Sequence, residues 1–283
     1  PLPVQFNSWC ASASVNHFHT HIIDEHPPIT KRPLVPGPVV AGVRCLTPVG
    51  FGACCIQGVC MDDYAAQDCA DAYGFFYNQQ FCTDVICETI ISVDDDGLDD
   101  PDAVFNDIQD AIDYSGPGFV INVQPGTYTG DGDSVITLPE HGITIFGVPG
   151  STIIDGEGER RGLIGDGCGD TGTVINGLTF ANGQANEGAG AYLYQCNPEI
   201  INCRFVDNRA EQHPGNGGGL TLRESSPIVT NCQFIDNYAK GYGGGMLSNQ
   251  DSNPIVTGCT FESNEADGPL GDGTGGGFHC SSG

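Results

Sequence analysis

The chain has 283 residues and a formal net charge of −27, because 36 acidic residues outnumber nine basic ones. Nucleic acid is therefore not expected as a partner, since neutralising phosphates requires Lys and Arg. No apolar stretch is long enough to predict a membrane span. Fourteen cysteines predict an oxidising, extracellular location, and the lack of any Asn-x-Ser/Thr sequon favours a bacterial origin.

Residues 1–44 are expected to form an extended, Pro-rich N-terminal arm. Within this arm, His17, His19 and His21 would share one face if the segment is extended, since side chains alternate along a strand. Alternating imidazoles can chelate a transition metal. An exposed polar strand face is the competing interpretation of the same pattern.

Residues 45–88 are expected to form a small disulfide-rich module. It contains six closely spaced cysteines, namely Cys54, Cys55, Cys60, Cys69, Cys82 and Cys87. The adjacent pair at its start, and the lack of paired CxxC motifs, favour disulfides over a zinc site. The sequence does not choose among the connectivities that six cysteines allow. Cys10 and Cys45 remain as a further natural pair across the Pro-rich arm.

Residues 89–118 are predicted to supply a capping strand and helix. The helix is expected over Asp102–Ser115, where Pro101 suits the first turn and the apolar stripe consists of Val104, Ile108, Ala111 and Ile112. Such a helix would cover the open end of whatever core follows it.

A dense acidic run precedes this helix. The spacing of Asp94, Asp96 and Asp99 suggests a Ca²⁺ loop, although the Glu that completes an EF-hand is absent. The alternative is a solvated turn that places acids at the N-terminus of the helix, where the dipole favours them. Ca²⁺ is the one cofactor that the sequence suggests.

Residues 119–283 are expected to form the coils of a solenoid. β-rich runs bounded by Gly, Pro or Asp occur at Phe119–Tyr128, Val135–Val148, Ser151–Gly156 and Thr173–Phe180. Three nearly identical segments follow at Asn197–Ala210, Ser226–Ala239 and Asn253–Ala266, each succeeded by a run of three glycines. A period of 29 and then 27 residues, measured between their phenylalanines, is typical of stacked repeats.

The repeated residues are the ones that a coil needs for packing and turning. The inward pairs would be Cys203/Phe205, Cys232/Phe234 and Cys259/Phe261, and the turn residues would be Asn208, Asn237 and Asn264. The three cysteines are expected to pack as small hydrophobes, and a disulfide between two of them is left open. Cys168 and Cys196 occur near matching corners and are disulfide candidates. The predicted fold is all-β: a right-handed parallel β-helix, or solenoid, with a short N-terminal capping helix and a small disulfide-rich N-terminal module.

Three parts of the chain resemble known families. The segment from Cys54 to Cys87 looks like a small cysteine-rich repeat of secreted planctomycete proteins. Ile91–Tyr128 resembles the first segment of pectate-lyase-like right-handed β-helix proteins. The repeats are similar to the NC-x-F units with glycine triplets of bacterial polymorphic outer-membrane and surface proteins. The resemblance implies the fold but not the activity, because this superfamily spans lyases, hydrolases, adhesins and structural fibres.

No catalytic residues are predicted, because the coil bases do not form a column and the polygalacturonase-type and pectin-esterase-like patterns are absent. The first hypothesis is a secreted structural protein that assembles head to tail with copies of itself. It draws on the last residues, Gly275–Gly283, which read as the start of another coil without a cap. The alternatives are a polysaccharide lyase or hydrolase, and a non-catalytic adhesin that binds cell-surface glycans through turn tyrosines, namely Tyr192, Tyr194, Tyr238 and Tyr242.

Overall fold

The computed structural model describes residues 51–56, 59–71, 75–78, 80–82, 89–213, 215–249, 251–268 and 275–281. The chain divides into two compact units, Pro1–Glu88 and Thr89–Gly283. The predicted histidine site and the pair Cys10–Cys45 lie outside the described residues, as do Cys87 and the side chain of Cys55.

The N-terminal unit contains a small antiparallel sheet in the order β2 (Val59–Ala65), β1 (Phe51–Ile56), β3 (Phe75–Asn78). Disulfides join Cys54 to Cys69 and Cys60 to Cys82. Cys69 lies in a helix, α1 (Ala66–Asp71), that the sequence analysis did not predict. Six residues make fewer than two turns, too few to show helical periodicity. Its buried disulfide, rather than an apolar stripe, ties this helix to β1.

The second unit begins with β4 (Ile90–Val93) and a helix, α2 (Ile108–Tyr114), shorter than predicted. The Asp107 side chain caps the helix by accepting hydrogen bonds from the backbone N–H groups of its second and third residues. Pro101 and Val104 therefore lie outside the helix, and Val104 is 60% exposed. The chain before the cap instead runs beside β4, where Phe105 bridges Val93. The helix packs against β4, β5 and β7 in the first coils, as expected of a capping helix.

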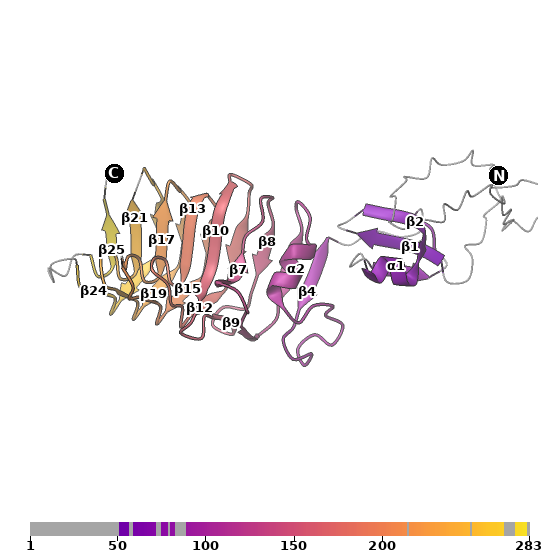
Figure 1. Ribbon diagram of the computed structural model, residues 1–283, viewed down its shortest axis with the longest axis horizontal. Coiled ribbons are helices and arrows are strands. Elements are labelled where there is room, and N and C mark those ends of the chain that lie inside the picture. Colours follow the sequence, from indigo (N-terminus) through magenta and orange to yellow (C-terminus); the bar gives the residue numbers. More distant parts are fainter. Residues whose placement is uncertain are drawn as a thin grey trace, which may run out of the picture. The chain divides into compact units, whose positions relative to one another are not determined.

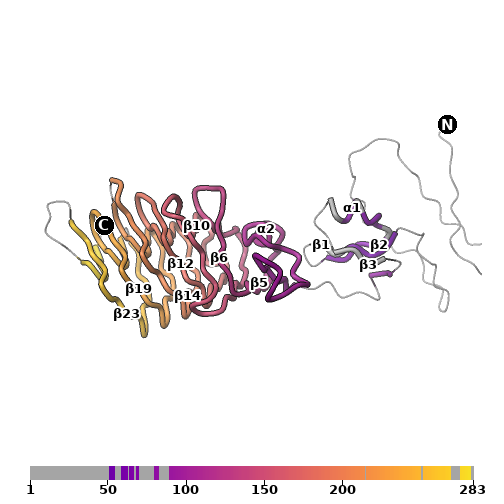
Figure 2. The backbone as a smooth tube through the Cα atoms, turned by 90° about the horizontal axis from the view of Figure 1, so that it is seen from below, coloured from indigo at the N-terminus to yellow at the C-terminus, as the bar shows by residue number. Residues whose placement is uncertain are grey.

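Three parallel sheets run along the second unit, and each coil of the chain contributes one strand to each (Figures 1 and 2). The first sheet consists of β7 (Ser134–Thr137), β10 (Arg161–Gly169), β13 (Ala191–Cys196), β17 (Leu220–Arg223), β21 (Met246–Asn249) and β25 (Phe278–Cys280). The second consists of β4, β5 (Val120–Val123), β8 (Thr144–Phe146), β11 (Val174–Asn176), β14 (Glu199–Ile201), β18 (Ile228–Thr230) and β22 (Ile255–Thr257). The third consists of β6 (Gly126–Tyr128), β9 (Thr152–Asp155), β12 (Thr179–Ala181), β15 (Arg204–Val206), β19 (Gln233–Ile235) and β23 (Thr260–Glu262).

The last three full coils add a short fourth strand each. These strands form a further parallel sheet of β16 (Arg209–Ala210), β20 (Tyr238–Ala239) and β24 (Glu265–Ala266). The corners on either side of the third-sheet strands have positive φ, between 53° and 55°, at Asn202, Asp207, Asn231 and Asp236. Asn and Asp tolerate this conformation better than other non-glycine residues, because their short side chains can bond locally. The architecture is a parallel β-helix.

The glycine runs return the chain to the first sheet. The first glycine of each run, at Gly217, Gly243 and Gly275, has φ between 59° and 69°, a conformation that favours glycine, and Gly188 at the matching place in the preceding coil has φ 56°. Gly219, the third of its run, is constrained by space instead. A Cβ there would lie 2.4 Å from the carbonyl oxygen of Gly245 and 3.0 Å from the Phe234 ring. The glycines therefore allow neighbouring coils to approach each other over the aromatic core.

A column of stacked phenylalanines fills that core. Ring centroids are 5.1 Å apart for Phe180 and Phe205, 4.8 Å for Phe205 and Phe234, and 4.7 Å for Phe234 and Phe261. The first three rings have at most 1% of their surface exposed. Burying one such ring stabilises the fold by roughly 1.5–3 kcal/mol. Cys203, Phe205, Cys232 and Phe234 are buried, whereas Cys259 and Phe261 of the last pair are partly exposed; Phe180 extends the column by one coil.

Candidate functional site

Large polar and aromatic side chains gather on the outer face of the first sheet. Arg161 begins β10, Tyr192 and Tyr194 lie in β13, and Arg223 ends β17; with Glu187 they form what we name the Tyr–Arg cluster. Side chains alternate along β13, so the two tyrosines point to the same side while the residue between them is buried. The parallel register places Arg223 beside Tyr194 on the next coil.

One glutamate holds both guanidinium groups of the cluster. Arg223 donates Nη2 to the carboxylate of Glu187. Arg161 donates Nη2 to the backbone carbonyl of Glu187 at 2.9 Å, and Nε to the carbonyl of Gly188 at 3.0 Å. Its guanidinium carbon lies 5.2 Å from the centre of the Tyr192 ring, within the range of a cation–π interaction. The cluster is therefore fixed by contacts among its own members.

Burial sets the charge states of the cluster. It lowers the pKa of the Arg161 guanidinium, which nonetheless stays protonated because its ordinary value is so high. Burial also raises the pKa of the Tyr192 phenol, which remains neutral at physiological pH. Asp166, exposed beside Tyr194 in the register of β10 and β13, adds a second carboxylate. The two guanidinium groups thus offset part of the negative charge of Glu187, Asp166 and Asp133 around this patch.

The cluster can bind a flat polar ligand. Half-buried phenol rings offer an apolar surface, while fixed guanidinium and carboxylate groups can bond to hydroxyls. Acids and bases on adjacent coils were the pattern expected for an enzyme. The polar hollows lined by Arg204 and by Arg209 contain none of the cluster residues. The cluster presents its rings and charged groups on the outer face of the first sheet, an arrangement suited to binding a ligand.

The sequence analysis found the tyrosines but misplaced them. Tyr192 and Tyr194 lie within β13, and Tyr238 within β20, so the expectation of exposed turns was wrong for all three. The i, i+2 spacing of the first two was the available signal, because it puts both rings on one face of a strand. Arg223 comes one repeat after Tyr194, so the repeat spacing could also have predicted that it lies beside Tyr194 in the Tyr–Arg cluster.

The predicted calcium ligands are arranged differently from expectation. Carboxylate oxygens of Asp94, Asp95 and Asp96 lie within 4.8 Å of one another, whereas Asp99 contributes its backbone N–H to the Asp94 carboxylate. Asp94 also accepts the N–H of Asp100 at 2.6 Å. This N–H is the main cause that lowers the pKa of Asp94. Asp94 therefore organises the loop, and Ca²⁺ binding there stays a prediction.

The inward cysteines carry free thiols. Cys203 and Cys232 are buried, and Cys259 is partly exposed on the next coil. The backbone N–H of Cys232 donates to the Cys259 sulfur at 3.4 Å, and a hydrogen bond with Cys203 raises the pKa of the Cys232 thiol to about 12. The Cys232 thiol is therefore a neutral packing group.

A disulfide does join two neighbouring coils elsewhere, between Cys168 in β10 and Cys196 in β13. These are the two cysteines that the sequence analysis placed near matching corners of successive coils.

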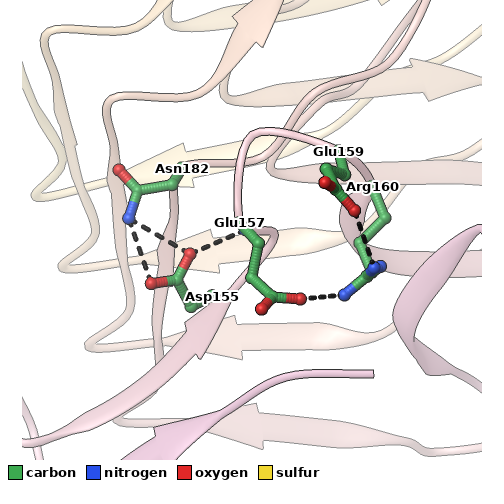
Figure 3. A network of polar contacts seen from close by, with 5 residues as sticks. All are labelled: Asp155, Glu157, Glu159, Arg160 and Asn182. Atoms are coloured by element: carbon green, nitrogen blue, oxygen red, sulfur yellow. Dashed lines mark hydrogen bonds and ion pairs between the residues drawn. The ribbon is translucent and has the colours of Figure 1, made fainter. Parts of the chain in front are cut away.

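A second polar network occupies the loop after β9 (Figure 3). Both carboxylate oxygens of Asp155 accept from Asn182 Nδ2 at 3.1 Å, and one also accepts the backbone N–H of Glu157 at 2.8 Å. Arg160 pairs with Glu157 and, at 3.2 Å, with Glu159. Each member bonds within the loop or to the adjoining coil, so we assign this network a structural role.

Comparison with known proteins identifies the fold class. Residues 151–283 match a family model described as a right handed beta helix region. Together with the parallel sheets, this match shows that the coils form a right-handed parallel β-helix, and confirms the predicted fold. No curated protein and no solved structure matches the chain. Among the described residues, no helix has the length and apolar character needed to cross a membrane.

Proposed function

We propose that the protein is a secreted structural component of a cell surface or extracellular matrix, in which the coil stack serves as a stiff support. The observation that carries the proposal is the ladder of Asn208, Asn237 and Asn264, of which the first two are fully buried. These repeated side chains are hydrogen-bonded to one another from coil to coil. Three disulfides among the described residues suit an oxidising compartment.

Fibre formation by end-to-end contact of copies is the specific form of this proposal. A charge of −27 on each copy opposes association. A divalent cation would remove this opposition by binding carboxylates, and Ca²⁺ prefers such oxygen ligands. The acidity and the proposed assembly are therefore linked, and Ca²⁺ should control the process.

Electron microscopy and analytical ultracentrifugation of the purified protein test this link. Fibres are expected in Ca²⁺ and their loss in EDTA, with NaCl at matched ionic strength as the control. A D96N/D99N variant, altered at two exposed acids, should need more Ca²⁺ if the acidic run holds the ion. Monomers in every buffer would refute fibre formation. The role of the coil stack as a stiff support would then be tested by the stability of the folded protein.

The Tyr–Arg cluster favours a second candidate, a non-catalytic adhesin that binds cell-surface glycans. A sugar ring can stack on Tyr192 or Tyr194 while its hydroxyls bond to the guanidinium and carboxylate groups beside them. A glycan-array screen with Y192A/Y194A should show at least a tenfold loss of affinity, about 1.4 kcal/mol. F146A, at an exposed aromatic residue of the second sheet, is the matched control. Shortened glycans in the same samples would instead support the lyase or hydrolase alternative.

A further inference from the structure

A small polar hollow lies where the second sheet turns into the third. Its volume is about 220 Å³. It is lined by Arg204, by the amide side chains of Asn202, Asn231 and Gln233, and by the turn at Pro149 and Gly150. The volume is that of roughly seven water molecules in the liquid, which leaves room for one small molecule. None of the residues that line it is acidic, although the chain contains 36 acids.

Two neighbouring buried polar atoms have no hydrogen-bond partner within the described structure. They are Nε of Arg204, a residue that lines the hollow, and Oγ1 of Thr179, on the strand next to it. The two residues face each other in the register of β15 and β12, and Thr179 is only 6% exposed. Buried polar groups are nearly always paired, so two adjacent exceptions indicate that a partner is missing.

Arg204 also differs from other arginines of the coils in its charge pairing. Arg160, Arg209 and Arg223 each form an ion pair with a glutamate. No described acid lies within ion-pair distance of Arg204, whose Nη1 reaches toward the turn, 3.8 Å from the place of a Cβ on Gly150. The hollow thus holds an uncompensated positive charge on a chain that is otherwise strongly negative.

We propose that this hollow binds the carboxylate of a small hydroxy acid. The planar edge of a guanidinium, Nε with one Nη, matches the two oxygens of a carboxylate, and the unpaired Thr179 hydroxyl lies on the strand next to Arg204. The side chains of Asn231 and Gln233 make no hydrogen bond to the described residues, and so can bond to the hydroxyls of the ligand. The site lies on the third sheet and its corner, away from the Tyr–Arg cluster on the first sheet, and is independent of fibre formation.

Titration of the ¹⁵N-labelled full chain tests the proposal, with the Arg204 Nε–Hε resonance as the readout. D-glycerate, acetate, glycerol and sulfate are the probes. Saturable shifts are expected with glycerate, weaker binding with acetate, and none with glycerol. R204Q should abolish the binding, and T179V should weaken it several-fold while keeping the shape of the side chain.

The control variant is R209Q. Arg209 lines a separate hollow of about 290 Å³ beside Asp207, is exposed, and pairs with Glu211. R209Q should bind glycerate as the wild type does. Equal binding of sulfate and glycerate would overturn the assignment in favour of a nonspecific anion site. Unchanged binding in R204Q would overturn it too, as would an Arg204 resonance that no probe shifts in the millimolar range, which would indicate that water fills the hollow.

Discussion

Asn208 and Asn237 share a hydrogen bond of 2.9 Å between buried side chains, with Nδ2 of Asn208 donating to Oδ1 of Asn237. The same oxygen accepts the backbone N–H of Asn208 at 3.1 Å, and Nδ2 of Asn237 donates to the carbonyl of Phe205 at 2.8 Å. One side chain thus makes three hydrogen bonds to the preceding coil. This bonding sets the register of the stack independently of the strands.

The substitution N237A should destabilise the stack by about 2–6 kcal/mol, because two buried donors lose their acceptor at roughly 1–3 kcal/mol each. Urea unfolding followed by circular dichroism measures the loss. N186A, at an exposed asparagine, is the control and should stay within about 0.5 kcal/mol of the wild type. Equal stability of the two variants would show that the ladder contributes nothing.

Substituting Gly219 by Ala should cost more than about 2 kcal/mol, because the new methyl group would meet the Gly245 carbonyl oxygen at 2.4 Å. The backbone of the neighbouring coil would have to move away, and the Phe stack would open with it. The comparison is G132A, where the nearest atom to a Cβ is 3.6 Å away. The thermal unfolding midpoints of both variants test this prediction. A wild-type midpoint for G219A would contradict the close approach of the coils at Gly219 and Gly245.

Asp94 should make stability depend on pH in the acid range. Backbone N–H groups, chiefly that of Asp100, lower the pKa of its carboxyl below the ordinary value of 3.8. The ionised form therefore stabilises the folded state above that value, and this contribution disappears as the pH falls through the lowered pKa. The urea midpoint of D94N should be reduced near neutral pH and should approach that of the wild type below about pH 4. D96N, at an exposed acid, should show the same dependence of the urea midpoint on pH as the wild type. If the difference between D94N and the wild type stays constant with pH, ionised Asp94 does not stabilise the fold.

The free cysteines should differ sharply in reactivity toward iodoacetamide. Cys280 is exposed and should be modified in the native protein. Cys232 is buried and its thiol has a pKa of about 12, so almost none is thiolate at pH 8. Peptide mapping by mass spectrometry should find Cys203 and Cys232 labelled only in urea. Labelling of Cys232 at the rate of Cys280 would show that the column opens in the native state.

The core of the coils could be predicted because each of its residues recurs. Once Phe205, Phe234 and Asn237 are recognised as repeated, alternation along a strand and a fixed period determine which side chains face inward. Local competition was harder to foresee. Several aspartates before α2 can cap a helix, and the sequence did not single out Asp107, which does so. The backbone N–H groups of Asp99 and Asp100 are bonded to the Asp94 carboxylate instead.

The outer surfaces could not be predicted to the same degree. Tyr194 and Arg223 become neighbours only through the register between coils, which the sequence shows only after the strands are known. The unpaired Nε of Arg204 is harder still to predict, because it depends on no neighbouring side chain offering a hydrogen-bond acceptor. Such features depend on residues that vary between repeats, where a period carries no information.

The connecting segments 211–219 and 240–245 differ in length, yet the strands that flank them keep their register. The length of a connecting segment can therefore change without altering how neighbouring coils pair. Duplicating one unit would lengthen the molecule by a strand spacing, about 4.8 Å, without a new core having to be invented. Altering one connecting segment would change the exposed side chains at that coil only. The number of coils and the sequence of each connecting segment can therefore change independently in evolution: the first sets the length of the stack, and the second sets the local surface.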